Sequence, residues 1–311
     1  MQKYVLGIDV GGTNIKLGLV NPRGRVISRT NLATKSFIRN KKKLVRALLS
    51  EIKFIIQAKK LSKKNLVGIG IGLPGAVNNQ KGIVHYLTNI SGWRNVPLKK
   101  IIEKEIHIPT FLDNDVNCVT LGEWKYGSGR GISNLICLTL GTGVGGGLIL
   151  NGAIYRGEGF AAGEAGHMPL NEEGEKCNCG GYACLETAIG NQYLLKKAQK
   201  IFKQKNPTLE NITFLAAQGN PKAIRFWKET AGHLGRGLIG VVNLLNPRLI
   251  VIGGGTANAH RFMFREITRI IKCHAMKQQS KMAVLKKATL GNDAGIIGAQ
   301  VLVKDALGIK S

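Results

Sequence analysis

The chain has 311 residues, enough for a large core and for about two domains. Hydrophobic residues make up 44% of the chain and mean hydropathy is near zero, which excludes an intrinsically disordered protein. No apolar run reaches the roughly 20 residues that a membrane span requires, and the N-terminus lacks the apolar segment of a secretory signal. We therefore expect a cytoplasmic globular protein with no membrane partner.

The charge balance is unusual: 45 Lys and Arg against 18 Asp and Glu give a net charge of +27. Such a field attracts polyanions, including nucleic acid. The lysines, however, occur in short runs on expected helix surfaces and ends, as at 41–43, 59–60 and 196–197. Arginine, which reads bases better, is the minority cation, and aromatic residues do not alternate with the basic runs. We therefore expect no specific nucleic-acid partner.

Strands and helices alternate along the chain. Buried strands are expected at 4–9, 15–20, 66–73, 110–112, 134–140, 147–150 and 249–252. Helices are expected from residue 43 to 56, where apolar residues recur at helical spacing, and at 187–204, 221–245 and 294–307. This order predicts an α/β protein.

Three glycine-rich turns directly follow strands: DVGGTN at 9–14, LGTGVGGG at 140–147 and GGG at 253–255. Glycine lets the main chain approach a phosphate and adopt the positive φ of anion-binding turns. Each turn alone is more often an ordinary hairpin, and neither a Walker loop nor a dinucleotide fingerprint is present. Together, with an acid in the first turn, they predict a nucleotide held between two lobes.

The segment LDNDVN, at 112–117, places two aspartates and two asparagines where a strand meets a helix. Such residues are favoured helix N-caps, so the cluster has a purely structural interpretation. Open α/β sheets also bind ligands beyond the carboxyl ends of their strands. In that case Asp115 suits a general base.

Three of the six cysteines lie within CNCGGYAC at 177–184, and His167 precedes them by ten residues. A reducing compartment disfavours a disulfide, a redox pair is usually Cys-x-x-Cys, and a polar glycine-rich loop is a poor place to bury thiols. Three thiolates and one imidazole form a closed tetrahedral zinc set. We expect a structural zinc bound by His167, Cys177, Cys179 and Cys184. The other cysteines are expected in the core: Cys118, Cys137 and Cys273.

Taken in order, DVGGTNIK, GLPGAV, LDNDVN, LTLGTGVGGG, GEAGH, CNCGGYACLE and GGG resemble the motifs of the ROK family (repressor, open reading frame, kinase). Within that family they are most similar to those of bacterial glucokinases. The resemblance implies the two-lobed actin-like ATPase fold of sugar kinases and Hsp70-like proteins, with a structural zinc loop. It implies an N-terminal α/β lobe of 1–115, joined by a C-terminal helix at about 297–311. The larger C-terminal lobe is then 116–296, with the zinc loop at 167–184.

The resemblance implies transfer of the γ-phosphate of ATP to a hexose, with glucose the expected substrate and Asp115 the catalytic base. The implied sugar contacts are Gly75, Asn89, Asn114, Glu164, His167 and Glu186. The implied nucleotide contacts are Asp9, Gly11, Gly12, Thr13, Lys16, Gly141, Thr142, Gly143, Gly254 and Gly255. Asp9 would lie near the Mg²⁺ that accompanies ATP, and His167 would serve both zinc and sugar. A homo-oligomer, dimer or tetramer, is also implied.

Several alternatives stay open. N-acetylmannosamine, fructose and mannose kinases share these motifs, and polyphosphate is an alternative donor. A ROK repressor carries a winged-helix domain before the first phosphate loop, which begins here at residue 9, so the sequence favours a kinase. A non-catalytic sugar sensor is the remaining rival, and the intact Asp115 and phosphate loops argue against it.

Overall fold

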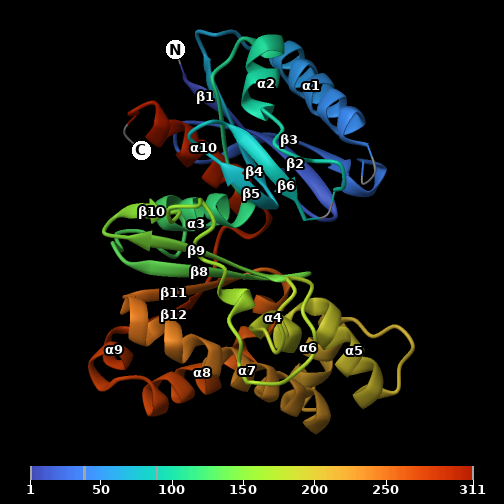
Figure 1. Ribbon diagram of the computed structural model, residues 1–311, viewed down its shortest axis with the longest axis vertical. Coiled ribbons are helices and arrows are strands. Elements are labelled where there is room, and N and C mark those ends of the chain that lie inside the picture. Colours follow the sequence, from blue (N-terminus) through green and yellow to red (C-terminus); the bar gives the residue numbers. More distant parts are fainter. Residues whose placement is uncertain (1, 38–39, 89, 310–311) are drawn as a thin grey trace. The chain divides into compact units, whose positions relative to one another are not determined.

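The computed structural model describes residues 2–37, 40–88 and 90–309. The chain divides into two units, each with a five-stranded sheet of its own (Figure 1). The first unit consists of Met1–Gly131, Ile154–Ala162 and Asn292–Ser311, and the second of Ile132–Ala153 and Gly163–Gly291. Both units are therefore assembled from segments that are distant in the sequence.

The first unit has a mixed sheet in the order β3-β2-β1-β4-β7. Its strands are β1 (Tyr4–Val10), β2 (Asn14–Val20), β3 (Val26–Ala33), β4 (Leu66–Leu73) and β7 (Thr110–Asn114). β2 is antiparallel to both of its neighbours, whereas β1, β4 and β7 are parallel. A separate hairpin consists of β5 (Gly75–Asn78) and β6 (Ile83–Leu87). Parallel strands bring their carboxyl ends to one edge of the sheet.

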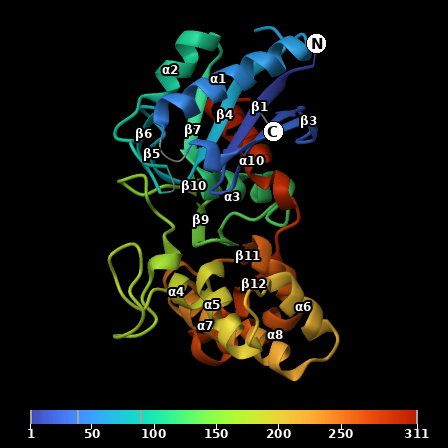
Figure 2. The ribbon, with the colours of Figure 1, turned by 90° about the vertical axis from the view of Figure 1, so that its right-hand side faces the viewer.

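Helices cover both faces of this sheet (Figure 2). They are α1 (Lys41–Ala58), α2 (Leu98–Ile106), α3 (Asp115–Tyr126) and α10 (Ala294–Ala306), with the 3-10 turns η1 (Thr34–Phe37) and η4 (Gly291–Asp293). Side chains alternate along β1 because successive residues of a strand point to opposite faces. Leu6 and Ile8 are buried in the core that includes α1. Gly7 meets α10, where a Cβ would overlap the Ile296 carbonyl.

The second unit has a mixed sheet in the order β10-β9-β8-β11-β12. Its strands are β8 (Leu135–Leu140), β9 (Val144–Leu150), β10 (Ala153–Tyr155), β11 (Leu249–Gly253) and β12 (Val284–Lys287). Its helices are α4 (Leu185–Ile189), α5 (Asn191–Phe202), α6 (Leu209–Ala217), α7 (Pro221–Leu245), α8 (His260–His274) and α9 (Lys277–Met282), with η2 (Ala165–His167) and η3 (Gly255–Ala259). Phe226 and Trp227 of α7 are buried at the centre of its core.

Local sequence sets the limits of the long helices. The Asn220 side chain accepts hydrogen bonds from the N–H groups of Lys222 and Ala223, and Pro221 occupies the first helical position, so α7 begins there as predicted. The single helix expected at 187–204 is instead two helices. The chain leaves helical geometry at Gly190, which ends α4 and precedes α5.

The predicted lobe limits at 115 and 296 place both α3 and residues 154–162 in the larger C-terminal lobe. In the structure, both of these segments belong to the first unit. The reason for α3 is its packing against α10. Two glycines permit this close approach: Gly122 faces the Ala294 carbonyl and Gly298 faces the Cys118 carbonyl. The expectation that Cys273 lies in the core is wrong, since this residue is exposed near the end of α8.

The contact between α3 and α10 is open to a direct stability test. We expect Gly298→Ala to lower the free energy of unfolding by about 1–3 kcal/mol, the usual cost of overpacking, because the new Cβ would overlap the Cys118 carbonyl. Gly240→Ala in α7 is the matched control, because nothing lies within 4 Å of an added Cβ there. That exposed substitution should stabilise the helix by up to about 1 kcal/mol. Urea unfolding measures both changes, and no loss at Gly298 would contradict the described packing.

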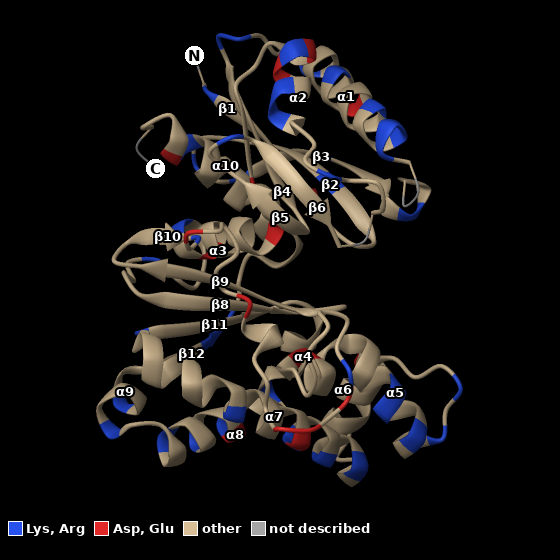
Figure 3. Cartoon of the chain, in the orientation of Figure 1, with Lys and Arg blue, Asp and Glu red and all other residues tan. Residues whose placement is uncertain are grey.

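Basic side chains are spread over the helices of both units (Figure 3). The run at Lys41–Lys43 opens α1, and Lys196 and Lys197 lie on α5, with Lys42, Lys43 and Lys196 exposed. Lys59 and Lys60 directly follow the end of α1, so these runs lie on helix surfaces and ends, as the sequence predicts. Within the described ranges, no helix combines the length and apolar character needed to cross a bilayer.

Candidate active site and metal centre

The carboxyl edge of the first sheet carries the polar turns that the sequence singled out. In the strand register, Asp9 of β1 lies opposite Gly72 of β4, and Gly72 lies opposite Asp113 of β7. Asp115 follows two residues later as the first residue of α3. The β1–β2 glycine turn and the β7–α3 junction therefore lie on the same edge, where open α/β sheets bind their ligands.

Asp9 is a largely buried carboxylate at the end of β1. Its Oδ2 lies 3.9 Å from the Nζ of Lys16, which also donates to the Asn292 carbonyl at 3.3 Å. Burial raises the pKa of Asp9, and the Lys16 ammonium opposes that rise. Gly295 of α10 packs against this carboxylate so closely that a Cβ would lie 2.7 Å from Cγ. A carboxylate in this position can bind a divalent cation, because Mg²⁺ prefers oxygen ligands.

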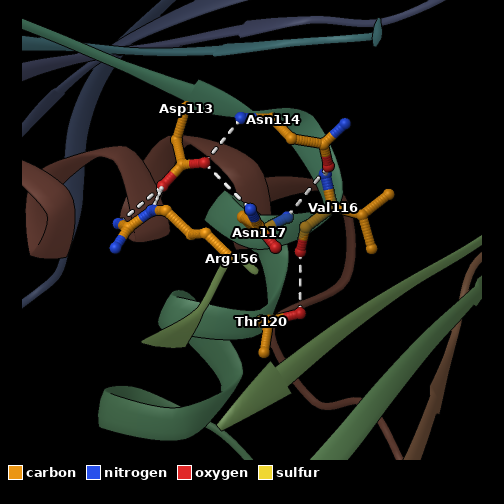
Figure 4. Close-up of polar contacts among 6 residues, drawn as sticks. All are labelled: Asp113, Asn114, Val116, Asn117, Thr120 and Arg156. Atoms are coloured by element: carbon orange, nitrogen blue, oxygen red, sulfur yellow. Dashed lines mark hydrogen bonds and ion pairs between the residues drawn. The ribbon is translucent and has the colours of Figure 1, made fainter. Parts of the chain in front are cut away.

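Hydrogen bonds fix the turn from β7 into α3 (Figure 4). Asn114 is the N-cap: its Oδ1 accepts from the N–H groups of Val116 at 2.8 Å and Asn117 at 3.2 Å. Its Nδ2 donates to the Gly75 carbonyl at 3.3 Å. The Oδ1 of Asp115 accepts from the Val116 N–H at 3.0 Å. The N-cap interpretation of this cluster is thus confirmed for Asn114.

Asp113 is 2% exposed, accepts three hydrogen bonds and forms an ion pair with Arg156 (Figure 4). Its Oδ1 accepts from the Asn114 N–H at 2.8 Å and from Asn117 Nδ2 at 2.9 Å. Its Oδ2 accepts from Arg156 Nε at 2.8 Å and lies 2.7 Å from Nη2 of the same side chain. Both oxygens of this buried carboxylate therefore have partners.

The pKa of Cys118, in α3, is affected by the carboxylates at this edge of the sheet. Burial raises the pKa of its thiol well above the usual value, and the carboxylates of Asp113, Asp9 and Asp115 raise it further. Arg156 acts in the opposite direction. The charges of Asp9, Asp113 and Asp115 are therefore all felt by one buried thiol of the first unit.

In the second unit, hydrogen bonds from residues of α4 and α5 fix the turn between β8 and β9. Glu186 Oε2 accepts from the Val144 N–H at 2.8 Å, and Gly143 leaves the room for that carboxylate because a Cβ would overlap it. Asn191 N–H donates to the Gly141 carbonyl at 2.9 Å. The backbone of this glycine turn is therefore preorganised by the first residues of α4 and α5.

The glycine turn after β11 lies against the turn after β8. Gly254 has a φ of +83°, and a Cβ there would overlap the Leu140 carbonyl. Thr256 Oγ1 donates to Asn191 Oδ1 at 2.8 Å, so Asn191 contacts both turns. Two of the three predicted phosphate-type turns thus meet within one unit.

His167, Cys177, Cys179 and Cys184 form a compact donor set. One ligand atom from each lies within 4.8 Å of all the others. His167 Nδ1 is 3.6 Å from Cys177 Sγ, and Cys179 Sγ is 3.7 Å from Cys184 Sγ. For tetrahedral Zn²⁺, bond lengths of ~2.3 Å to sulfur and ~2.0–2.1 Å to nitrogen give donor separations of about 3.8 and 3.6 Å. The four side chains therefore fit the zinc site that the sequence predicts.

The two nitrogens of His167 face different groups. While Nδ1 lies beside Cys177, Nε2 lies 3.9 Å from Glu164 Oε2. Partial burial raises the pKa of Glu164, His167 opposes the rise, and the charge of Glu186 adds to it. The donor set is thus adjacent to two carboxylates.

The ROK family model matches residues 5–306, nearly the whole chain. The chain belongs to the ROK family. It is 34% identical to a glucokinase of Halalkalibacterium halodurans, over 97% of this chain and 96% of that protein. It is also 29% identical to a xylose repressor of Caldicellulosiruptor bescii, over 96% of this chain but only 77% of the repressor.

Solved structures of the family have the same α/β fold with mixed sheets. A ROK family glucokinase from Streptomyces griseus, in complex with glucose and AMPPNP, aligns with a TM-score of 0.83 and 27% identity. The alignment covers 97% of this chain and 99% of that one. A ROK hexokinase from Thermus thermophilus aligns with a TM-score of 0.81 and 28% identity, covering 99% of this chain and 100% of that chain.

This ROK protein distributes the predicted site residues over both units. In the first unit, most lie at the sheet edge described above: Asp9, Gly11, Gly12, Thr13, Lys16, Gly75, Asn114 and Asp115. In the second unit lie Gly141, Thr142, Gly143, Glu164, His167, Cys177, Cys179, Cys184, Glu186, Gly254 and Gly255. Asn89 lies outside the described residues.

Sequence reasoning missed three residues that organise these turns. The sequence places Asp113 in a capping cluster, and its position directly before the N-cap Asn114 is the one signal of its further role. Arg156 carries no signal in the sequence, because it directly follows the short strand β10 and is 43 residues from its partner Asp113. Asn191 carried none either, since its contacts with Gly141 and Thr256 depend on packing.

Proposed function

We propose that this ROK protein is an ATP-dependent hexose kinase that converts glucose into glucose 6-phosphate. The observation that carries the proposal is the first sheet edge, where Asp115 and the glycine turn after Asp9 share one side of three parallel strands. Similarity over nearly full length to proteins named glucokinase supports the choice of reaction and of glucose.

In this proposal Asp115 is the general base. It takes the proton of the sugar 6-hydroxyl while that oxygen bonds to the γ-phosphorus and ADP leaves. Phosphoryl transfer needs little covalent help, so the protein acts by positioning the hydroxyl in line and by removing this proton. Asn114, fixed as the N-cap of α3, keeps the neighbouring peptide rigid and is assigned as a sugar contact.

For the nucleotide, we assign the backbone of Gly11, Gly12 and Thr13 and the side chain of Lys16 in the first unit. In the second unit we assign two turns to phosphate and adenosine: Gly141, Thr142, Gly143, Gly254 and Gly255. Backbone N–H groups bind phosphate where side chains are absent. Asp9 is assigned to Mg²⁺, which when bound with ATP neutralises charge on the β- and γ-phosphates.

We assign the four-residue donor set to one structural Zn²⁺. Its thiols and imidazole suit this metal, and all four tetrahedral positions are filled by protein. Cys177 and Cys184 are buried, and none of the six cysteines is in a disulfide. Free thiols and an ATP substrate are consistent with a cytoplasmic enzyme.

The zinc site is proposed to shape the sugar site through His167. Because Nδ1 faces the thiols, Nε2 is directed to the side of Glu164 and can meet a sugar hydroxyl there. Glu164 and Glu186 are assigned as further sugar contacts. A metal ligand whose second nitrogen is engaged elsewhere has its ring orientation fixed.

The proposal is tested by a panel of purified sugars crossed with two phosphate donors. Glucose, mannose, fructose and N-acetylmannosamine are each incubated with ATP or polyphosphate, and ADP and phosphosugar are measured. We expect the largest kcat/KM with glucose and ATP. A higher value for another sugar, or for polyphosphate, would overturn the corresponding part of the assignment.

The alternative of a sugar-responsive repressor follows from the xylose repressors among the relatives. A gel-shift assay on random-sequence DNA fragments separates it from the kinase: specific retention without phosphosugar formation would favour the repressor. We further propose that the enzyme is a homo-oligomer, a dimer or tetramer, which light scattering measures directly.

A further inference from the structure

Arg156 lies in a short segment that belongs to a different unit from the residues flanking it in sequence. Residues on both sides of it in sequence, up to Ala153 and from Gly163, belong to the second unit, yet Ile154–Ala162 packs with the first. The segment closes on itself, because Ala162 N–H donates to the Arg156 carbonyl at 2.9 Å. Its only ion pair among the described residues is the one that Arg156 forms with Asp113.

This ion pair is largely shielded from solvent. Asp113 is 2% exposed and the side chain of Arg156 is 20% exposed. Both Nε and Nη2 bind the same carboxylate oxygen, at 2.8 and 2.7 Å. If Arg156 were removed, Asp113 would lose the one ion pair that it forms among the described residues and would remain a buried carboxylate without a cation beside it.

The other oxygen of Asp113 holds both ends of the turn that contains Asp115 (Figure 4). It accepts from the Asn114 N–H, one residue before Asp115, and from the side chain of Asn117, two residues after it. Arg156 binds one oxygen of Asp113 and the turn binds the other, so the position of the carboxylate depends on both contacts. Arg156 therefore holds in place the carboxylate that accepts this pair of hydrogen bonds.

We propose that Arg156 is a positioning residue, which through Asp113 fixes the backbone turn that carries Asn114 and Asp115. The proposal rests on the assignment of Asp115 as the base. Arg156 does not contact the reacting atoms in this scheme. Its effect follows from geometry, since a displacement of about 1 Å of a reacting group can cost about 10²-fold in rate.

The test compares Arg156→Met and Arg156→Lys with the parent enzyme in steady-state assays with glucose and ATP. We expect kcat of Arg156→Met to fall about 10²-fold. The Kd for AMPPNP should stay unchanged, because the nucleotide turn after β1 is held by other residues. Lysine supplies charge but not the planar two-nitrogen fork, so Arg156→Lys should recover only part of the loss.

A readout that a merely structural role would not move is chemical rescue. We expect free guanidinium, at concentrations that leave the parent enzyme unaffected, to restore part of kcat to Arg156→Ala. Lys197→Met is the matched control: it removes a 2.8 Å ion pair with Glu229 in the second unit, where Arg225 still pairs with that glutamate. Its kcat should stay within about twofold of the parent value, as for a surface pair.

Two results would overturn the proposal: a parental kcat in folded Arg156→Met or Arg156→Lys, or a folded Arg156→Ala that guanidinium does not rescue. If Arg156→Met fails to fold, the lysine variant decides the question alone. Asp115→Asn is assayed in parallel. An active Asp115→Asn would refute the base assignment, whereas an inactive Asp115→Asn beside a fully active Arg156→Met would refute only the role of Arg156.

Discussion

Asp115→Asn is expected to lower kcat by at least about 10²–10⁴-fold, the usual contribution of a positioned base. Asparagine has nearly the same shape as aspartate, and its side-chain oxygen can still accept from the Val116 N–H. The helix should therefore start in the same place, and the loss should fall on proton removal. Glucose binding, measured by calorimetry, should remain detectable.

The control for this variant is Asp305→Asn, at the other end of α10. Asp305 is an acid of the same unit near the C-terminal end of α10, whereas it is Gly295, near the N-terminal end, that packs against Asp9. Burial raises the pKa of Asp305, and the charges of Lys125, Arg156 and Lys304 oppose the rise. Its kcat should be close to that of the parent enzyme. Near-parental activity of Asp115→Asn, or an equal loss in Asp305→Asn, would contradict the role of Asp115.

The second large effect is expected at the metal centre. Elemental analysis of the purified protein should find about one zinc per chain, and Cys177→Ser or Cys179→Ser should lose it. Structural zinc can supply about 10 kcal/mol or more of apparent binding free energy, so the loop 167–184 should lose its ordered structure. Because His167 would then be unanchored, we expect glucose affinity to fall more than affinity for AMPPNP.

Cys273→Ser is the matched control for the metal centre. Cys273 is an exposed thiol in α8 and is not part of the four-residue donor set. This variant should keep both the zinc and the parental glucose affinity. Zinc-free protein with full glucose affinity, or a zinc content that survives both cysteine substitutions, would contradict the proposed site.

The fold was predictable where the local pattern determines the structure. The apolar spacing of α1 and the Asn-Pro start of α7 identify these helices, and the runs at 4–9 and 66–73 identify two buried strands. Elements with weaker hydrophobic patterns were not predicted from the sequence. β3 alternates between partly buried and exposed positions, and α8 buries only a narrow stripe, so neither stood out in the sequence.

The motifs of the candidate site were predictable from the sequence, but the contacts that hold the site residues in place were not. The metal donor set follows from spacing, since His167 and the three cysteines lie within 18 residues and meet within one unit. Asp113 and Arg156 are 43 positions apart, and only the packing of 154–162 onto the first unit joins them. Contacts between distant segments have no local pattern, so sequence reasoning passes over them.

The most direct test of the central claim is the transfer of label from γ-³²P-ATP to glucose by the purified, zinc-containing protein. We predict labelled glucose 6-phosphate in amounts equal to the ADP formed, and its absence when Asp115→Asn is used instead. Protein that binds glucose and ATP but forms no labelled sugar phosphate would contradict the account, and would identify this ROK protein as a sugar sensor.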